Sequence, residues 1–119
     1  PEARTPRYVQ RAIRKAGRDT SGNTGMVLTV AFDYGSRAEI VHAARAAAAA
    51  GVVDQQSLSE HLYLPDLPDV DVVVRTSGEH RISNFMLWQS EGAKVYFSDL
   101  TWPDFDGPAL DAAIALVRR

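Results

Sequence analysis

Apolar residues recur at helical spacing near the start of the chain and then change to a continuous run. Residues 6–17 carry apolar side chains three or four positions apart, with Thr5 as a predicted N-cap, Pro6 as the first helical residue and Gly17 as the stop. This pattern predicts an amphipathic helix. Residues 26–32 are almost wholly apolar, which predicts a strand buried on both faces, as in a parallel sheet.

The order of helix and strand then repeats. Ser36 and Glu39 predict a capping box that begins an alanine-rich helix, and Gly51 predicts its end. Ser57 and Glu60 predict a second capping box before a short helix. The remaining predicted elements are a strand at residues 70–74, a helix from Ser83 through Gln89, a strand at residues 95–97 and a helix from Gly107 to the end of the sequence.

Strands thus alternate with helices over residues 1–119, and no linker segment divides them. Such alternation predicts an α/β fold in a single domain, with a Rossmann-like open parallel sheet flanked by helices. Ligands of such sheets bind just beyond the carboxyl ends of the strands. Three strands are few for this architecture, and each needs a neighbour at its edge, so the fold is expected to be incomplete without a partner or a further segment.

The segment after the second predicted strand carries the residue types of a phosphate site. Arg75 and Arg81 present planar donor forks that match phosphate oxygens, Gly78 lies in a turn between them, and Ser83 adds a hydroxyl. A loop that leads from a strand into a helix N-terminus would add backbone N–H groups aimed at the same anion. Residues 75–83, named the clamp loop, are therefore predicted to bind a phosphorylated ligand.

An alternative for the two arginines is an exposed ion pair with a nearby carboxylate such as that of Glu79. Exposed ion pairs are common and contribute about 0–1 kcal/mol. Of the three histidines, only His80 lies in the clamp loop, and no two have the spacing of metal ligands.

Composition narrows the classes of partner. The chain is 45% hydrophobic and 24% charged, with a net charge of −2 and a pI near 5.9, so it has no general attraction to nucleic acid. It contains no cysteine, which agrees with a reducing compartment and makes the cytoplasm the expected location. No apolar run has the length of a membrane span and no leader is recognised, so membrane contact is expected only at the periphery, through a lipid ligand.

Several stretches resemble the cis-prenyltransferases, the family of undecaprenyl diphosphate synthase. They are RTSGEHRISNF at residues 75–85, LWQ at 87–89, WPDF at 102–105, NTG at 23–25 and DYGSR at 33–37. The similarity covers residues 24–106 and corresponds to the C-terminal half of the family's fold.

The resemblance implies a transferase that condenses isopentenyl diphosphate with an allylic prenyl diphosphate to give a Z-configured polyprenyl diphosphate. It implies that Arg75, Arg81 and Ser83 bind the diphosphate of isopentenyl diphosphate and that Glu79 belongs to the same substrate-binding set. No catalytic residue is identified in this chain. Because the family forms dimers, a homodimer or a heterodimer with a longer homologue is expected.

Two departures from the family pattern concern magnesium, the cofactor that the resemblance implies. The family's N-terminal half is not part of this sequence, and it includes the Asp-Gly-Asn-x-Arg-Trp loop that binds the allylic diphosphate and supplies a metal ligand. Lys94 stands where the family commonly has a glutamate of the magnesium site. The chain is thus expected to offer no metal ligand. Lys94 either neutralises diphosphate charge directly, or it faces solvent and the chain has lost this part of the magnesium site.

Two other functions are open. A non-catalytic partner subunit, lending half a site to a fuller synthase, would account for the missing half. A generic nucleotide-binding module is disfavoured, because the sequence has no Gly-x-Gly-x-x-Gly or Walker-type loop. Product length and the choice of allylic substrate depend on segments outside this sequence.

Overall fold

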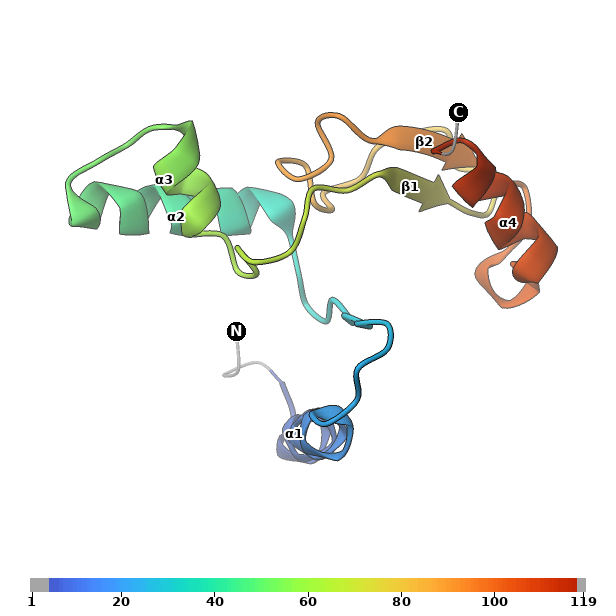
Figure 1. Ribbon diagram of the computed structural model, residues 1–119, viewed down its shortest axis with the longest axis horizontal. Coiled ribbons are helices and arrows are strands. Elements are labelled where there is room, and N and C mark those ends of the chain that lie inside the picture. The colour runs from blue at the N-terminus through green and yellow to red at the C-terminus, as the bar shows by residue number, and fades with distance from the viewer. Residues whose placement is uncertain (1–4, 118–119) are drawn as a thin grey trace. The chain divides into compact units, whose positions relative to one another are not determined.

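The computed structural model describes residues 5–117, and the chain divides into two compact units, residues 1–33 and residues 34–119 (Figure 1). Helix α1 belongs to the first unit, and the second contains the sheet and helices α2, α3 and α4. The single domain expected over residues 1–119 stays a prediction.

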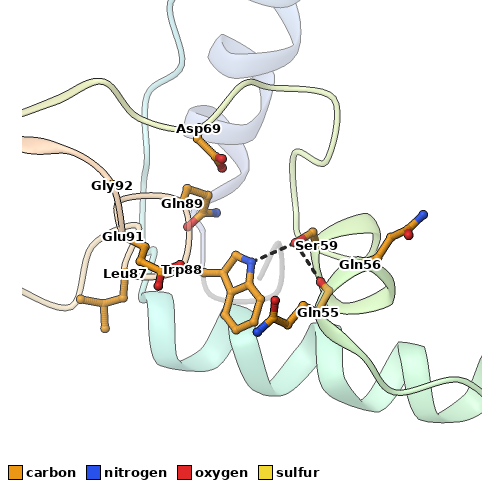
Figure 2. A pocket seen from close by; sticks show the side chains of 9 residues that line it. All are labelled: Gln55, Gln56, Ser59, Asp69, Leu87, Trp88, Gln89, Glu91 and Gly92. Carbon is orange, nitrogen blue, oxygen red and sulfur yellow. Dashed lines mark hydrogen bonds between the residues drawn. The ribbon is translucent and has the colours of Figure 1, made fainter. Parts of the chain in front are cut away.

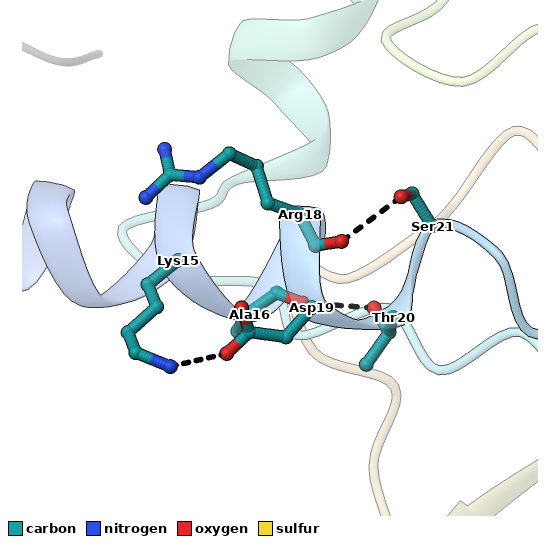
Figure 3. A network of polar contacts seen from close by, with 6 residues as sticks. All are labelled: Lys15, Ala16, Arg18, Asp19, Thr20 and Ser21. Carbon is teal, nitrogen blue, oxygen red and sulfur yellow. Dashed lines mark hydrogen bonds and ion pairs between the residues drawn. The ribbon is translucent and has the colours of Figure 1, made fainter.

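Helix α1 (Arg7–Thr20) continues three residues past Gly17, where the sequence predicted its end. Lys15 forms an ion pair with Asp19 one turn later, and the Thr20 hydroxyl donates to a carbonyl one turn earlier at 2.9 Å (Figure 3). Glycine inside a helix costs about 1 kcal/mol relative to alanine, which is too little to end a helix supported on both sides. No residue of α1 is buried, so its apolar face is uncovered in the described part of the chain.

The strand predicted at residues 26–32 is not formed, and this prediction is wrong. The segment is irregular and its apolar side chains are largely exposed, with 89% for Met26, 78% for Leu28 and 77% for Val30. A strand is completed by hydrogen bonds to a neighbouring strand, and within residues 5–117 this segment has no such neighbour.

Strands β1 (Val72–Arg75) and β2 (Lys94–Phe97) form a two-stranded parallel sheet (Figure 1). Val72 lies opposite Lys94, and Arg75 lies opposite Phe97. The parallel pairing confirms the predicted α/β class, although the described residues form two strands where three were expected.

Helix α4 (Gly107–Ala115) contacts β1, and its Ala113 is fully buried. Its N-cap is Asp106, whose carboxylate accepts from the backbone N–H of Ala109 at 3.1 Å. Residues 118–119, which the sequence places in this helix, lie outside the described residues. A search of residues 5–117 finds no helix with the length and apolarity to cross a bilayer.

Helices α2 (Ser36–Ala50) and α3 (Gln55–Glu60) contact each other. The end of α2 at Gly51 is confirmed, because Gly51 has a φ of 88°, a left-handed conformation that glycine adopts without a side-chain penalty. The buried residues of α2 are three or four positions apart and form one stripe, made of Ser36, Glu39, Ala43 and Ala47.

Neither predicted capping box is formed. The N-cap of α2 is Gly35, which offers no side-chain acceptor, and the N-cap of α3 is Asp54, which accepts from the Ser57 backbone N–H at 2.7 Å. Ser36 and Glu39 bond instead to segments far away in the sequence. Their spacing of three positions places both on the buried stripe, and that stripe faces other parts of the fold.

Candidate functional site

The clamp loop begins where β1 ends, at Arg75. Ser77 and Gly78 both have a φ of 66°, so two successive left-handed residues turn the chain sharply. The backbone N–H of Ser77 donates to the Leu100 carbonyl at 2.7 Å, and that of Gly78 donates to the Ser98 carbonyl at 3.0 Å. These two amides therefore anchor the turn to the segment that follows β2.

Arg75 and Arg81 converge on one carboxylate oxygen. Glu79 Oε2 lies 2.5 Å from Arg81 Nε and 3.8 Å from Arg75 Nη2. The Arg75 side chain is 26% exposed, whereas that of Arg81 is 74% exposed. The two guanidiniums therefore meet at one anionic group, and the pairing with Glu79 that the sequence allowed as an alternative is present.

Arg75 is incompletely bonded. Its Nε is buried and has no hydrogen-bond partner within the described residues, while its contact with Glu79 through Nη2 is long. Leaving a buried charged donor unsatisfied costs about 1–3 kcal/mol or more, so such a group calls for an acceptor. Arg75 thus has donor capacity left for an anion.

The helix predicted from Ser83 to Gln89 is not formed, and this prediction is wrong. Met86, in the middle of that stretch, has a φ of 46°, which interrupts a right-handed helix. Ser83 itself is half-buried in an irregular segment. The clamp loop therefore does not lead into a helix N-terminus, and the anion-binding amides of such a helix are absent from residues 83–89.

His80 lies on the sheet side of the loop. Its ring packs against that of Phe97, the last residue of β2, with centroids 4.9 Å apart. This contact ties the residue between Glu79 and Arg81 to the end of the second strand.

The segment after the clamp loop is held by the start of α2. The Asn84 carbonyl accepts from Ser36 N–H at 3.1 Å, and Asn84 Oδ1 accepts from Arg37 N–H at 2.8 Å. The fully buried Ser36 accepts from the Leu87 N–H at 2.8 Å. A Cβ at Gly35 would lie 2.9 Å from Asn84 Nδ2, so glycine permits this close approach.

Glu39 is a buried carboxylate beneath the same segment, with 2% of its surface exposed. Oε1 accepts from the Tyr63 N–H at 3.0 Å, and Oε2 accepts from Gln89 Nε2 at 3.2 Å and from the Tyr34 hydroxyl. Burial, and then the hydrogen bond to Glu39, raise the pKa of Tyr34 above its ordinary value. We call this group the Glu39 cluster. The sequence did not indicate it, because Glu39 was assigned to a local helix cap.

A cavity of about 560 Å³ in the second unit shares Gln89 with the Glu39 cluster (Figure 2). In its wall the Trp88 indole donates to Ser59 Oγ at 2.9 Å. Neither the two arginines of the clamp loop nor Ser83 line it. The lining residues are Gln55, Gln56, Ser59, Asp69, Leu87, Trp88, Gln89, Glu91 and Gly92.

Among residues 5–117, no three histidine, aspartate or glutamate side chains gather in a way that could hold a metal ion. Lys94 begins β2, three positions before the residue that pairs with Arg75, which separates it from the clamp loop by about 10 Å along the strand. Its ammonium donates to the Leu116 carbonyl at the end of α4. Lys94 is exposed, as one of its two alternatives expected, and it also contacts the end of α4. Neutralisation of diphosphate charge by Lys94 stays a prediction.

Comparison with known proteins gives consistent matches over almost the whole chain. The family model described as "Putative undecaprenyl diphosphate synthase" matches residues 2–118. An isoprenyl transferase of Neisseria meningitidis serogroup B is 47% identical over 115 residues, covering 95% of this chain and 46% of the relative. The ditrans,polycis-undecaprenyl-diphosphate synthase of Escherichia coli K12 is 42% identical over 114 residues, covering 89% of this chain and 45% of the relative. The chain spans about half the length of these relatives.

Two solved structures share the fold. A probable undecaprenyl diphosphate synthase from Campylobacter jejuni matches with a TM-score of 0.87 and 28% identity, covering all of this chain and 57% of its own. Lavandulyl diphosphate synthase from Lavandula x intermedia, in complex with dimethylallyl diphosphate, matches with a TM-score of 0.84 and 35% identity, covering 98% and 54%.

Proposed function

Because the chain belongs to the undecaprenyl diphosphate synthase family, as its sequence indicated, we propose that it forms the isopentenyl diphosphate binding half of a cis-prenyltransferase. In this role Arg75, Arg81 and Ser83 bind the diphosphate. The observation that carries the proposal is the convergence of two guanidiniums at the carboxyl end of β1, with the buried Nε of Arg75 still lacking an acceptor.

The chemistry assigned to these residues is positioning. A diphosphate held by two arginine forks and a hydroxyl fixes the alkene of isopentenyl diphosphate against the allylic carbon of the second substrate. The allylic C–O bond breaks and pyrophosphate leaves, a C–C bond forms to the alkene, and loss of a proton gives the new Z double bond. The allylic diphosphate is bound by segments outside this sequence.

The arginines are tested by substitution. Charge-assisted hydrogen bonds contribute about 1.5–3 kcal/mol each, so Arg75→Ala and Arg81→Ala should each raise the KM for isopentenyl diphosphate about tenfold or more. Lysine should restore only part of the loss, because it lacks the planar fork. The measurement is steady-state kinetics on whichever assembly is active, the chain alone or its complex with a longer relative.

Arg45→Ala, at an exposed position of α2, is the matched control and should leave the KM unchanged. A KM unaltered in both clamp-loop variants would remove the assignment. Isothermal titration with isopentenyl diphosphate gives a second readout that does not require turnover.

A non-catalytic partner subunit of a heteromeric cis-prenyltransferase is the second candidate. In this case the chain has no synthase activity alone, co-purifies with a longer homologue and raises the activity of that homologue. We further propose a cytoplasmic location, with contact to a membrane only through the lipid product. The absence of cysteine agrees with this location.

A further inference from the structure

The carboxylate that joins the two arginines is itself an anion in the middle of the proposed diphosphate site. Glu79 Oε2 contacts Arg81 Nε at 2.5 Å and Arg75 Nη2 at 3.8 Å. A diphosphate bound to the same guanidiniums would bring its charge close to this oxygen, and like charges at such distances repel. Glu79 and the ligand therefore compete for the same donors.

The backbone around Glu79 is fixed, whereas its side chain is free to turn away. The two residues before it are left-handed and are anchored by hydrogen bonds to the segment after β2. The residue after it, His80, packs on Phe97. The Glu79 side chain is 43% exposed, so rotation into solvent needs no movement of the loop.

In an ordinary stabilising ion pair, the carboxylate would accept from more of the guanidinium N–H donors than Glu79 does. Arginine pairs best with a carboxylate through two parallel N–H···O bonds, whereas Glu79 meets Arg75 through one long contact and leaves Arg75 Nε buried without a partner. One oxygen of Glu79 is shared between the two arginines. This geometry holds two like charges near each other and leaves Arg75 incompletely paired.

We propose that Glu79 is an internal anion that occupies the clamp loop until a diphosphate displaces it. The role rests on the proposed function of the arginines and gives Glu79 a different task from direct substrate binding. Glu79 carries one negative charge, so a multiply charged diphosphate gains more from the two guanidiniums than the carboxylate does. Displacing the carboxylate costs the same for any anion that binds both guanidiniums. Glu79 thus weakens anion binding at the clamp loop, and only a ligand with strong interactions of its own, such as a diphosphate, overcomes it.

The test is isothermal titration of the full 119-residue chain with inorganic pyrophosphate and, separately, with inorganic orthophosphate, without divalent cations. Glu79→Gln keeps the shape and removes the charge. It should bind pyrophosphate about five- to tenfold more tightly, from the loss of the two ion pairs of Glu79 and of one repulsion. Orthophosphate should also bind more tightly, but by no larger a factor, because the same carboxylate is displaced and the less charged ligand loses the smaller repulsion.

Glu91→Gln, at an exposed position outside the clamp loop, is the matched control and should change neither affinity. Glu79→Asp, one methylene shorter, should lie between wild type and Glu79→Gln. Unfolding midpoints of all variants by circular dichroism verify that they are folded.

The experiment distinguishes a failure of the role of Glu79 from a failure of the arginine site. Pyrophosphate binding that is unchanged or weaker in Glu79→Gln, with Arg75→Ala still abolishing it, overturns the role of Glu79 and leaves the arginine site standing. Folded wild type and variants that all fail to bind pyrophosphate overturn both the arginine site and the role built on it.

Discussion

Residues 26–32 and strand β1 are both mainly apolar, but only β1 is paired and largely buried. Residues 26–32 form the longer and more hydrophobic run, yet they are irregular, and Met26, Leu28 and Val30 are more than three-quarters exposed. Strand β1 is only four residues long, but every one of them is at least half-buried and pairs with β2. The two segments differ in whether a neighbouring strand pairs with them, and not in the apolar character of their own residues.

Strand propensity therefore measures how well a segment fits into a sheet. A segment with high strand propensity forms a strand only where a neighbouring strand can pair with it. In the second unit, pairing partners are present and contacts are satisfied across long sequence separations. In the first unit, the described apolar side chains of residues 26–32 face solvent. Three pairs of substitutions, each a test and its control, sharpen or break this comparison.

The largest effect is expected at Glu39, which connects three segments of the second unit. Glu39 is itself buried, and Glu39→Ala removes the acceptor of three donors, so the free energy of unfolding should fall by about 3 kcal/mol. Chemical denaturation monitored by circular dichroism measures it. Hydrogen exchange should accelerate around Gln89 and stay unchanged at residues 26–32.

Glu60→Ala is the control for this change. Within residues 5–117 the Glu60 carboxylate bonds to the exposed Gln56 side chain one turn earlier and to no other side chain, so its loss should cost less than about 0.5 kcal/mol. Equal stability of the two variants would show that the Glu39 cluster does not hold the unit together.

The second effect compares the two apolar runs directly. Val95→Asp puts a charge into the half-buried strand β2 and should lower the free energy of unfolding by about 2 kcal/mol. Leu28→Asp changes a side chain that is 78% exposed and should stay within about 0.5 kcal/mol of wild type. Urea midpoints of the purified chain provide the measurement, and a Leu28→Asp loss as large as that of Val95→Asp would erase the contrast.

The smallest effect is expected at Lys94. Helix α4 has no basic residue in its last described turn, and Lys94 supplies a cation and a donor to its end from the sheet. Lys94→Gln should lower the free energy of unfolding by about 0.5 kcal/mol through the helix dipole. Lys15→Gln in α1 breaks a local pair with Asp19 and should leave the thermal midpoint of the second unit unchanged. A Lys94→Gln midpoint identical to that of wild type would contradict the contact.

The sheet was predictable because its strands are short apolar runs ending at polar residues. The strand expected at residues 70–74 is observed as Val72–Arg75, and the one expected at residues 95–97 as Lys94–Phe97. The local sequence contains no sign that the helix expected from Ser83 to Gln89 would fail to form. Asn84 is bound to the start of α2, 47 positions earlier in the sequence, and no local signal reports such a contact.

The candidate site shows the same limit. The residue types of the clamp loop indicated an anion site, and its arginines do lie together. The Glu39 cluster stayed hidden, because a serine and a glutamate three positions apart also satisfy the pattern of a helix cap. Local and long-range partners compete for the same side chains, and the sequence alone does not rank them.

The close approach of Gly35 to Asn84 has a mechanical consequence. Asn84 immediately follows Ser83, and its amide fills the space that a methyl group at position 35 would occupy, 2.9 Å away. A larger residue there would force the Asn84 side chain to move, and with it the acceptor that Asn84 Oδ1 offers to the Arg37 N–H. The absence of a side chain at position 35 therefore preserves the attachment of the segment after Ser83 to the start of α2.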